Sequence, residues 1–174
     1  MNVLGGYFSH GPQAGELVFD SRATIPQGRG KRTRKSDAAR AEQNGLTAAE
    51  LGPIDTSGFL AFVWRLAGRP AAAGTGWSRE RPLVCVLDNY SVHKSARVRE
   101  EAVLLAAADV HLFYLPAYSP ELSEIEPIWR DVKHRLLVVR SYDSIRALKH
   151  AVDDALTRKA CMLRETAQSL RGYA

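Results

Sequence analysis

Two short apolar runs, Leu83–Leu87, which is unbroken, and Val110–Leu115, stand out in the hydrophobic pattern of the chain. Each has the length of a β-strand, and the segment between them predicts a helix over Ser95–Ala108. Two strands with a helix between them are typical of an α/β protein. In open α/β sheets, ligand sites lie outside the carboxyl ends of the strands, so the residues after each run become the first candidates for function.

The start of the chain has the alternating pattern of a β-hairpin. Asn2–Phe8 and Glu16–Phe19 are the expected strands, and His10–Gly15 is the expected turn, because it is rich in turn-forming residues.

Helical periodicity predicts three further helices: Thr56–Arg69 capped by Thr56, one that begins after Ser123, and Asp143–Arg158. Gly68–Ser78 is expected to be a loop. In each of the four expected helices, one set of apolar residues is expected to face inward. In chain order these sets are Phe59, Phe62, Val63 and Leu66; Val98, Ala102, Leu105 and Ala106; Ile125, Ile128, Trp129, Val132 and Leu136; and Ile145, Leu148, Val152, Ala155 and Leu156.

Length and composition place the chain among single-domain globular proteins, because 174 residues can bury a core of useful size. It has no run of 18 apolar residues, so no membrane span is expected. The residues Met1–Gly6 lack the pattern of a signal peptide. Cys85 and Cys161 have no Cys-x-x-Cys spacing, which argues against a zinc site and fits a reducing cytoplasm. Cys85 is expected to be a buried apolar residue.

The positive charge is concentrated in Gln27–Arg40. This segment holds six basic residues against Asp37, and the excess of five equals the formal net charge of +5 for the whole chain. Two interpretations stay open: a solvated, poorly ordered surface loop, or contact with nucleic-acid phosphates. The absence of interleaved aromatic residues argues against base stacking by this segment. The basic residues are Arg29, Lys31, Arg32, Arg34, Lys35 and Arg40.

Two acids follow the apolar runs, and each has a structural and a functional interpretation. Asp88-Asn89 ends the first run, where the pair is common in turns because both side chains bond nearby backbone. Ser123-x-x-Glu126 matches a capping box at a helix start. Alternatively, Asp88 and Glu126 converge on divalent metal ions, which prefer carboxylate oxygens and can activate a nucleophile and stabilise a leaving oxygen.

The motifs Leu-Asp-Asn-Tyr-Ser-Val-His (residues 87–93) and Leu115–Lys133 together resemble the catalytic core of DDE-superfamily transposases. The likeness is to the mariner-related bacterial insertion sequence 630 family and covers roughly Asn2–Leu156. It implies a ribonuclease-H-like mixed sheet flanked by helices, three catalytic acids, and Mg²⁺ or Mn²⁺ as cofactor. Asp88 matches the second acid and Glu126 the third, so both are expected metal ligands.

The resemblance also implies roles for other residues. His93 matches a motif histidine and is expected to line the catalytic site, with Asn89 and Tyr118 as supporting residues. Transposon ends and target DNA are the implied partners. Candidate DNA contacts are Arg29, Lys31, Arg32, Arg34, Lys35 and Arg130.

The sequence departs from the family pattern in three places. Leu122–Glu126 lacks the usual Asn-Pro pair, and 37 residues separate Asp88 from Glu126, slightly more than is usual. The hairpin matches the second strand onward, so the first strand and its Asp are expected to be missing. Glu16 and Asp20 lie on the second hairpin strand and are not expected to replace it. No helix-turn-helix precedes the hairpin.

The expected organisation is an N-terminally incomplete catalytic domain over residues 1–158, with a basic insertion at 27–40 and a tail at 159–174. It is expected to be inactive alone and to join an upstream-encoded transposase half, as a homo-oligomer when complete, in the cytoplasm and away from membranes. One alternative is a non-catalytic remnant that binds DNA or a transposase subunit. An unrelated α/β hydrolase or nucleotide-binding domain is disfavoured, because the chain has neither a Gly-rich phosphate loop nor a Gly-x-Ser-x-Gly motif.

Overall fold

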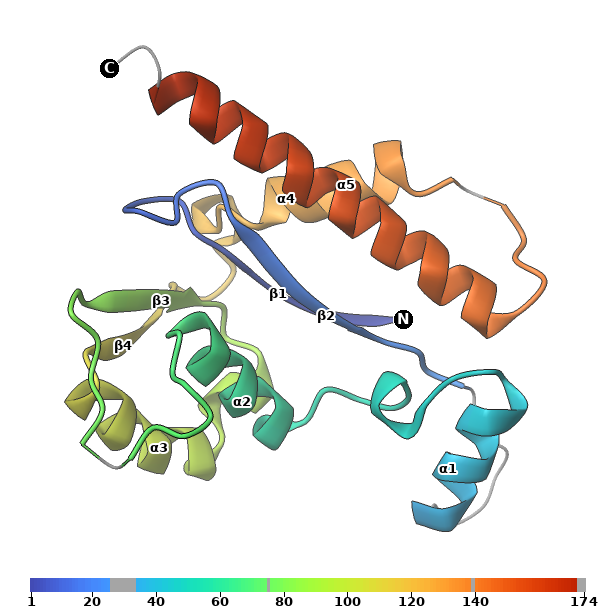
Figure 1. Ribbon diagram of the computed structural model, residues 1–174, viewed down its shortest axis with the longest axis horizontal. Coiled ribbons are helices and arrows are strands. Elements are labelled where there is room, and N and C mark those ends of the chain that lie inside the picture. Colours follow the sequence, from blue (N-terminus) through green and yellow to red (C-terminus); the bar gives the residue numbers. More distant parts are fainter. Residues whose placement is uncertain (26–33, 75, 139, 172–174) are drawn as a thin grey trace. The chain divides into compact units, whose positions relative to one another are not determined.

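The computed structural model describes residues 1–25, 34–74, 76–138 and 140–171, and for residues 34–37 it describes the backbone only. The chain divides into two compact units, one made of Met1–Ile54 and Pro127–Ala174 and the other of Asp55–Glu126. Each unit combines a pair of strands with helices (Figure 1), so the predicted α/β class is confirmed.

The predicted hairpin is present in the first unit. β1 (Asn2–Tyr7) and β2 (Leu17–Arg22) pair antiparallel, from Asn2 opposite Arg22 to Tyr7 opposite Leu17. The turn is closed by the amide of Gly15, which donates to the carbonyl of Phe8 at 2.8 Å. β2 begins one residue later than predicted and continues to Arg22, because β1 supplies a partner along that whole length.

The basic segment is partly helical. α1 (Arg34–Gln43) is followed by the short helix η1 (Ala48–Glu50). The expectation of a surface loop is therefore wrong for Arg34–Arg40, where α1 forms, and residues 27–33 lie outside the described residues. Alanines favour the helix, and its buried residue Ala41 packs against Ala23 and Leu46.

The core of the first unit forms where α4 (Glu126–Asp131), the π-helical turn η4 (Val132–Leu136) and α5 (Ile145–Arg171) meet the hairpin. Val132, Val152, Ala155 and Leu156 are buried there, as their helical spacing predicted. The partly buried residues packed against them include Met1, Phe19 and Trp129.

α5 is longer than predicted. The predicted helix ends at Arg158 and is followed by a tail from residue 159, yet the helix continues to Arg171, so the predicted end of the helix is wrong. Tertiary contacts hold this part: Nζ of Lys159 lies 2.6 Å from Oδ2 of Asp131. At the far end, Nη2 of Arg171 lies 3.1–3.3 Å from carbonyl oxygens of the hairpin turn, those of Gly11, Pro12 and Ala14.

The second unit contains the predicted strand–helix–strand segment. β3 (Leu83–Leu87) and β4 (Val110–Tyr114) pair in parallel, and α3 (Ala96–Ala107) connects them. α2 (Thr56–Leu66) and the short helices η2 (Ser91–Lys94) and η3 (Pro120–Leu122) complete the unit.

Most residues predicted to face inward in the second unit do so. Phe59, Phe62, Val63, Val98 and Leu105 are all buried, which confirms the helical stripes. Ala106 is exposed, so its assignment to the buried face of α3 was wrong. Leu66 and Ala102 are half-buried.

The N-terminal cap of α2 differs from the prediction. Asp55, not Thr56, caps α2, since its side chain accepts a 2.8 Å hydrogen bond from the amide of Gly58. The Thr56 hydroxyl instead donates to the hydroxyl of Ser95, which itself caps α3 by accepting from the amide of Val98.

The β3–β4 sheet has one covered and one open face. Val84, Val86 and Phe113 are exposed on the open face, whereas Cys85 points the other way and is half-buried. Burial raises the pKa of the Cys85 thiol to about 11, so it stays protonated at neutral pH.

Within the described ranges, each strand pairs only with its neighbour in the hairpin or the β3–β4 pair. The single mixed sheet of a ribonuclease-H-like fold therefore stays a prediction. No helix in these ranges combines the length and apolar character needed to cross a membrane.

Candidate active site

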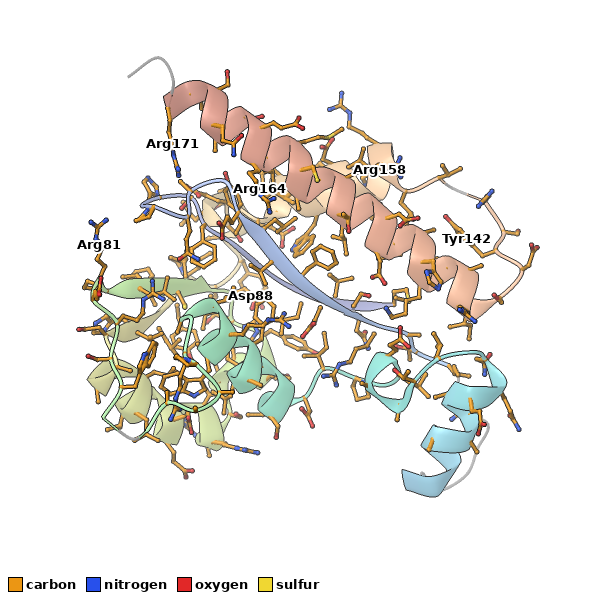
Figure 2. All side chains as sticks on the ribbon, in the orientation of Figure 1. Arg81, Asp88, Tyr142, Arg158, Arg164 and Arg171 are labelled. Atoms are coloured by element: carbon orange, nitrogen blue, oxygen red, sulfur yellow. The ribbon has the colours of Figure 1, made fainter. Side chains whose placement is uncertain are left out.

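Asp88 is the first residue after β3, at the carboxyl end of the strand (Figure 2). Its Oδ1 accepts a 3.0 Å hydrogen bond from the amide of Tyr90, which confirms the turn interpretation of Asp88-Asn89. The side chain is nevertheless 64% exposed, so the bond to Tyr90 does not withdraw the carboxylate from solvent. The turn role and a ligand role are therefore compatible.

His93 lies against this carboxylate. Its Nδ1 is 2.8 Å from Oδ1 of Asp88, although the direction of the ring N–H falls short of hydrogen-bond alignment. The imidazole is largely buried, and its ring centroid is 4.4 Å from that of Phe59. The Tyr114 hydroxyl donates to the His93 carbonyl at 2.6 Å, so both backbone and ring are held in place beside Asp88.

Asn89 connects the two loops that follow the parallel strands. Its Nδ2 donates to the carbonyl of Leu115 at 2.7 Å, and the amide of Leu115 donates to the carbonyl of Leu87 at 2.8 Å. The loop after β4 is thereby fixed next to the loop that carries Asp88. The supporting role predicted for Asn89 at a catalytic site stays a prediction.

Glu126 is the first residue of α4, and its side chain is exposed. The capping box predicted as its structural role is not formed. The amide of Ser123, which a capping box would direct to Glu126, donates to the carbonyl of Pro120 at 3.0 Å instead. Among the described residues, the Glu126 carboxylate has no hydrogen bond or ion pair and is available to a ligand.

Comparison with protein families finds a match to the DDE superfamily endonuclease model over residues 19–149. This range includes Asp88, His93 and Glu126 and most of the chain. The chain belongs to the DDE superfamily endonucleases. A comparison with curated proteins found no match, and neither did a comparison with solved structures.

Enzymes of the DDE superfamily generally use divalent metals, which need hard oxygen donors. Asp88 and Glu126 offer exposed carboxylate oxygens, the donors that Mg²⁺ and Mn²⁺ prefer. Each of the two carboxylates therefore has the donor chemistry of a ligand for a hard cation, and their joint role as metal ligands stays a prediction. The described residues hold no group of three or more His, Cys, Asp or Glu side chains that could bind a metal, so these residues do not form a complete two-metal site.

The predicted DNA contacts of this member of the DDE superfamily fall in three classes. Arg29, Lys31 and Arg32 lie outside the described residues. Arg34 and Lys35 begin α1, with only their backbone described. Arg130 is exposed in the last turn of α4.

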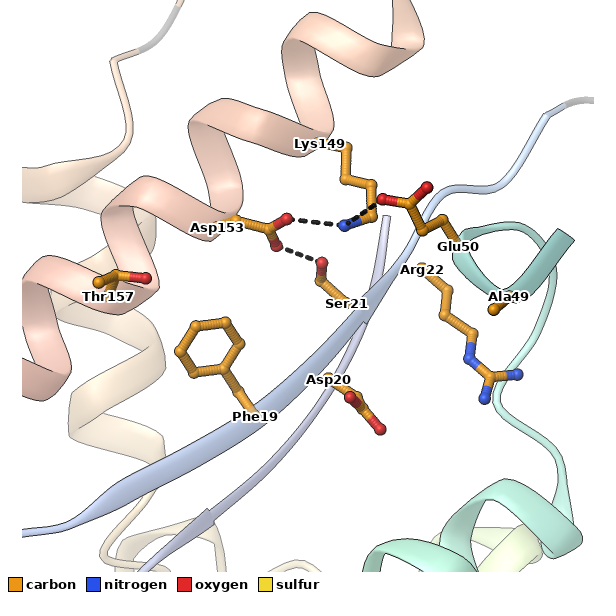
Figure 3. Close-up of a pocket in the computed structure, with 9 residues that line it drawn as sticks. All are labelled: Phe19, Asp20, Ser21, Arg22, Ala49, Glu50, Lys149, Asp153 and Thr157. Atoms are coloured by element: carbon orange, nitrogen blue, oxygen red, sulfur yellow. Dashed lines mark hydrogen bonds and ion pairs between the residues drawn. The ribbon is translucent and has the colours of Figure 1, made fainter. Parts of the chain in front are cut away.

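Sequence reasoning missed a polar cluster in the first unit, which lines an open cavity of about 560 Å³ (Figure 3). Lys149 is 8% exposed, and its Nζ lies 2.7 Å from Oδ2 of Asp153 and 3.3 Å from Oε1 of Glu50. Ser21 donates a hydrogen bond to Asp153. The Lys149–Asp153 spacing of i, i+4 was visible in the sequence, but Glu50 and Ser21 come from distant segments.

Charge and burial oppose each other at this cluster. Burial lowers the pKa of the Lys149 ammonium, but the hydrogen bonds and charges of Asp153 and Glu50 outweigh it and raise the pKa overall. Hydrogen bonds from the backbone and side chain of Thr47 lower the pKa of Glu50, and Lys149 adds to this effect. The cluster ties α5 to β2 and η1, so its role is structural.

Proposed function

We propose that this chain is a catalytic portion of a DNA transposase of the mariner-related insertion sequence 630 group. Residues 1–158 would form its ribonuclease-H-like domain and would take part in metal-dependent cleavage and transfer of DNA strands. The observation that carries the proposal is the pairing of Asp88 with His93 beside β3, together with a Glu126 carboxylate not engaged by its predicted cap.

Asp88 and Glu126 are the proposed metal ligands, with Mg²⁺ or Mn²⁺ as the ion. When bound, such an ion would polarise the scissile phosphate and lower the pKa of a nucleophilic water or 3′-hydroxyl. The hydrogen bond from Tyr90 and the contact with His93 both involve Oδ1 of Asp88. Oδ2 is therefore the oxygen proposed to bind the metal ion. His93 is thus proposed as a positioning residue that fixes the orientation of this carboxylate.

The third acid of the site is proposed to come from outside the described residues. Two carboxylates can retain one Mg²⁺ weakly, and Mg²⁺ gives up its waters reluctantly, so a second ion would lack an anchor. The proposed source is an upstream-encoded transposase half, with a homo-oligomer as the complete enzyme. The chain by itself is therefore proposed to bind DNA without cutting it.

The proposed DNA partners are transposon ends and target DNA, held through phosphate contacts. Arg29, Lys31, Arg32, Arg34, Lys35 and Arg130 are the proposed contacts. Phosphate contacts of this kind are independent of sequence and weaken as salt is added. Free Cys85 and Cys161 are in keeping with the cytoplasmic location proposed for the chain.

A second function is favoured by the lack of a three-acid group in the described residues. In this alternative the chain is non-catalytic and binds DNA or a transposase subunit. Binding of a divalent metal separates the two functions, since only the first requires it.

The decisive experiment titrates Mn²⁺ into the 174-residue chain and into variants, with the bound ion followed by electron paramagnetic resonance. We expect weak binding by the wild type and at least about tenfold weaker binding by Asp88→Asn and Glu126→Gln, since each removes a charged ligand. Glu121→Gln is the matched control, because Glu121 is an exposed acid in the neighbouring η3. Mn²⁺ binding that is unaffected by either variant would leave only the non-catalytic function.

Cleavage gives the second readout. Adding a segment with the missing Asp, fused or in trans, is expected to restore Mg²⁺- or Mn²⁺-dependent nicking, and Asp88→Ala is expected to abolish it. Efficient metal-dependent nicking by the 174-residue chain alone would refute the incomplete site and would implicate Glu16, Asp20 or Glu124.

A further inference from the structure

Tyr118 has a backbone conformation that is unfavourable for its residue type. Its φ is +58°, in the left-handed region, where a bulky side chain such as tyrosine is an outlier. Its side chain is also fully exposed, so the conformation is not compensated by burial of the ring. The chain thus holds an aromatic ring in solvent in a conformation that glycine would adopt more easily.

Asp109 provides an internal comparison, because it is the other non-glycine residue with positive φ in the described ranges, also at +58°. Its conformation has a structural explanation. Asp109 follows the end of α3, and aspartate tolerates the left-handed region better than larger residues do. Its carbonyl also accepts from the amide of Leu83 at 2.8 Å. Tyr118 lies in a turn, where a positive φ is usually taken by glycine or asparagine and not by a bulky aromatic residue.

A second exposed tyrosine lies at the same edge of the β3–β4 sheet. Tyr90 follows Asp88, is 61% exposed, and meets the His93 ring edge-on with centroids 5.9 Å apart. Tyr118 lies on the loop after β4, which the Asn89–Leu115 hydrogen bond fixes beside the Asp88 loop. The two loops that follow the carboxyl ends of β3 and β4 therefore each carry an exposed tyrosine.

We propose that Tyr118, assisted by Tyr90, stacks on unpaired nucleobases of the DNA strand held at Asp88. This inference rests on the proposed function, since it assumes that DNA reaches this edge of the sheet. An exposed ring has a free π-face that any base can stack on, whereas bases within a duplex already stack on their neighbours. The ligand is therefore a locally unpaired strand, and the backbone strain at Tyr118 is retained because it presents the ring.

The test compares two DNA probes of equal duplex sequence, one blunt and one with a short unpaired 3′ tail, at fixed salt and without divalent metal. The full chain is expected to bind the tailed probe more tightly. Tyr118→Ala is expected to reduce that preference about 5- to 150-fold, the effect of removing one base–aromatic stack. Affinity for the blunt probe should stay the same, because its phosphate contacts are unchanged.

Two further variants separate stacking from a structural role. Tyr118→Phe keeps the ring and should keep the tail preference. Tyr118→Gly should lose the preference and yet melt at a higher temperature than Tyr118→Ala, since glycine adopts the positive φ without strain. Loss of the tail preference in both variants, although their melting temperatures differ, cannot be attributed to reduced stability.

The outcomes distinguish this inference from the proposed function. Equal binding of tailed and blunt probes by wild type and Tyr118→Ala would overturn the stacking role while leaving DNA binding in place. Loss of tail preference in Tyr118→Phe would also overturn it, because the hydroxyl and not the ring would then be responsible. Failure of the wild type to bind either probe would instead overturn the proposed function.

Discussion

At the scale of single residues, Lys149 carries a charge that the fold buries only because two acids accompany it. An unpaired buried ammonium would be strongly unfavourable, and the ion pairs with Asp153 at 2.7 Å and Glu50 at 3.3 Å compensate for the hydration that burial removes. Both acids are about one-third exposed, so water screens part of the attraction.

Replacing Lys149 with methionine should lower the free energy of unfolding by about 2 kcal/mol. This is less than the roughly 3–5 kcal/mol typical of a broken, fully buried ion pair, because the two acids that remain are partly hydrated. Urea unfolding at neutral pH measures the change. Lys133→Met is the control, since Lys133 is exposed and should tolerate the same substitution with little effect. Equal reductions in stability for both variants would contradict a special role for Lys149.

The same cluster predicts how stability depends on pH. Glu50 has a pKa below its usual 4.5, so its contribution is complete above pH 4.5 and is lost as the pH falls further. Lys149 has a pKa above its usual 10.5, so its contribution is complete below pH 10.5 and is lost as the pH rises further. Glu50→Gln should reduce the acid-side decrease in stability in urea unfolding series. An acid limb that is unchanged in this variant would contradict the prediction.

At the scale of elements, the last part of α5 closes against the β1–β2 turn. Gly15 has φ +92°, and a Cβ built there would overlap the Cβ of Ala167 and lie 3.0 Å from the carbonyl oxygen of Leu163. Arg171 binds the carbonyls of the same turn. Lys159–Arg171 is therefore part of the folded unit, in contrast to the predicted tail.

Gly15→Ala should destabilise the chain by about 2–4 kcal/mol, through left-handed strain together with the overlap against α5. Gly11→Ala is a matched control in the same turn. Gly11 also has positive φ, at +79°, but nothing lies within 4 Å of its added Cβ, so only the strain of about 1–2 kcal/mol remains. Thermal or urea unfolding measures both. Equal destabilisation would show that α5 does not pack on the turn.

At the scale of the whole molecule, charge is distributed unevenly between the two units. Residues 1–54 and 127–174 hold 17 of the 24 Lys and Arg and 10 of the 19 Asp and Glu, for a net charge of +7. The unit Asp55–Glu126 holds the other 7 and 9, for −2. Exposed cations of the first unit include Arg158, Arg164 and Arg171 along α5 (Figure 2). The unit with the proposed catalytic acids is therefore not the one that carries the positive net charge.

Replacing Arg29, Lys31, Arg32, Arg34 and Lys35 with alanine should weaken DNA binding and flatten its salt dependence. Each phosphate that the variant no longer neutralises should reduce the slope of log affinity against log salt by about 0.9. Arg81→Ala with Arg99→Ala serves as the control, because both are exposed cations of the negatively charged unit and should change the slope much less. An unchanged slope in the variant of the basic segment would show that this segment does not bind phosphate.

The sequence by itself determined the elements whose signal is local. The apolar runs predicted β3 and β4, and the stripes through Phe59–Val63 and Val152–Leu156 predicted which faces of α2 and α5 are buried. These predictions succeeded because strand and helix periods depend only on the spacing of neighbouring residues. The motifs around Asp88 and Glu126 were local as well, and they were sufficient to identify the family.

Only the tertiary structure decided the features that depend on distant partners. Lys149 meets Glu50 from a segment far away in the chain, and α5 continues to Arg171 because the hairpin turn provides hydrogen-bond acceptors at its end. The sequence also could not show which acceptor the Ser123 amide would bind. The amide donates to the carbonyl of Pro120, so the capping box of Glu126 does not form. In each case several groups could pair with the same charge, pack on the same helix face or accept the same hydrogen bond. The fold selects among them by bringing one within reach.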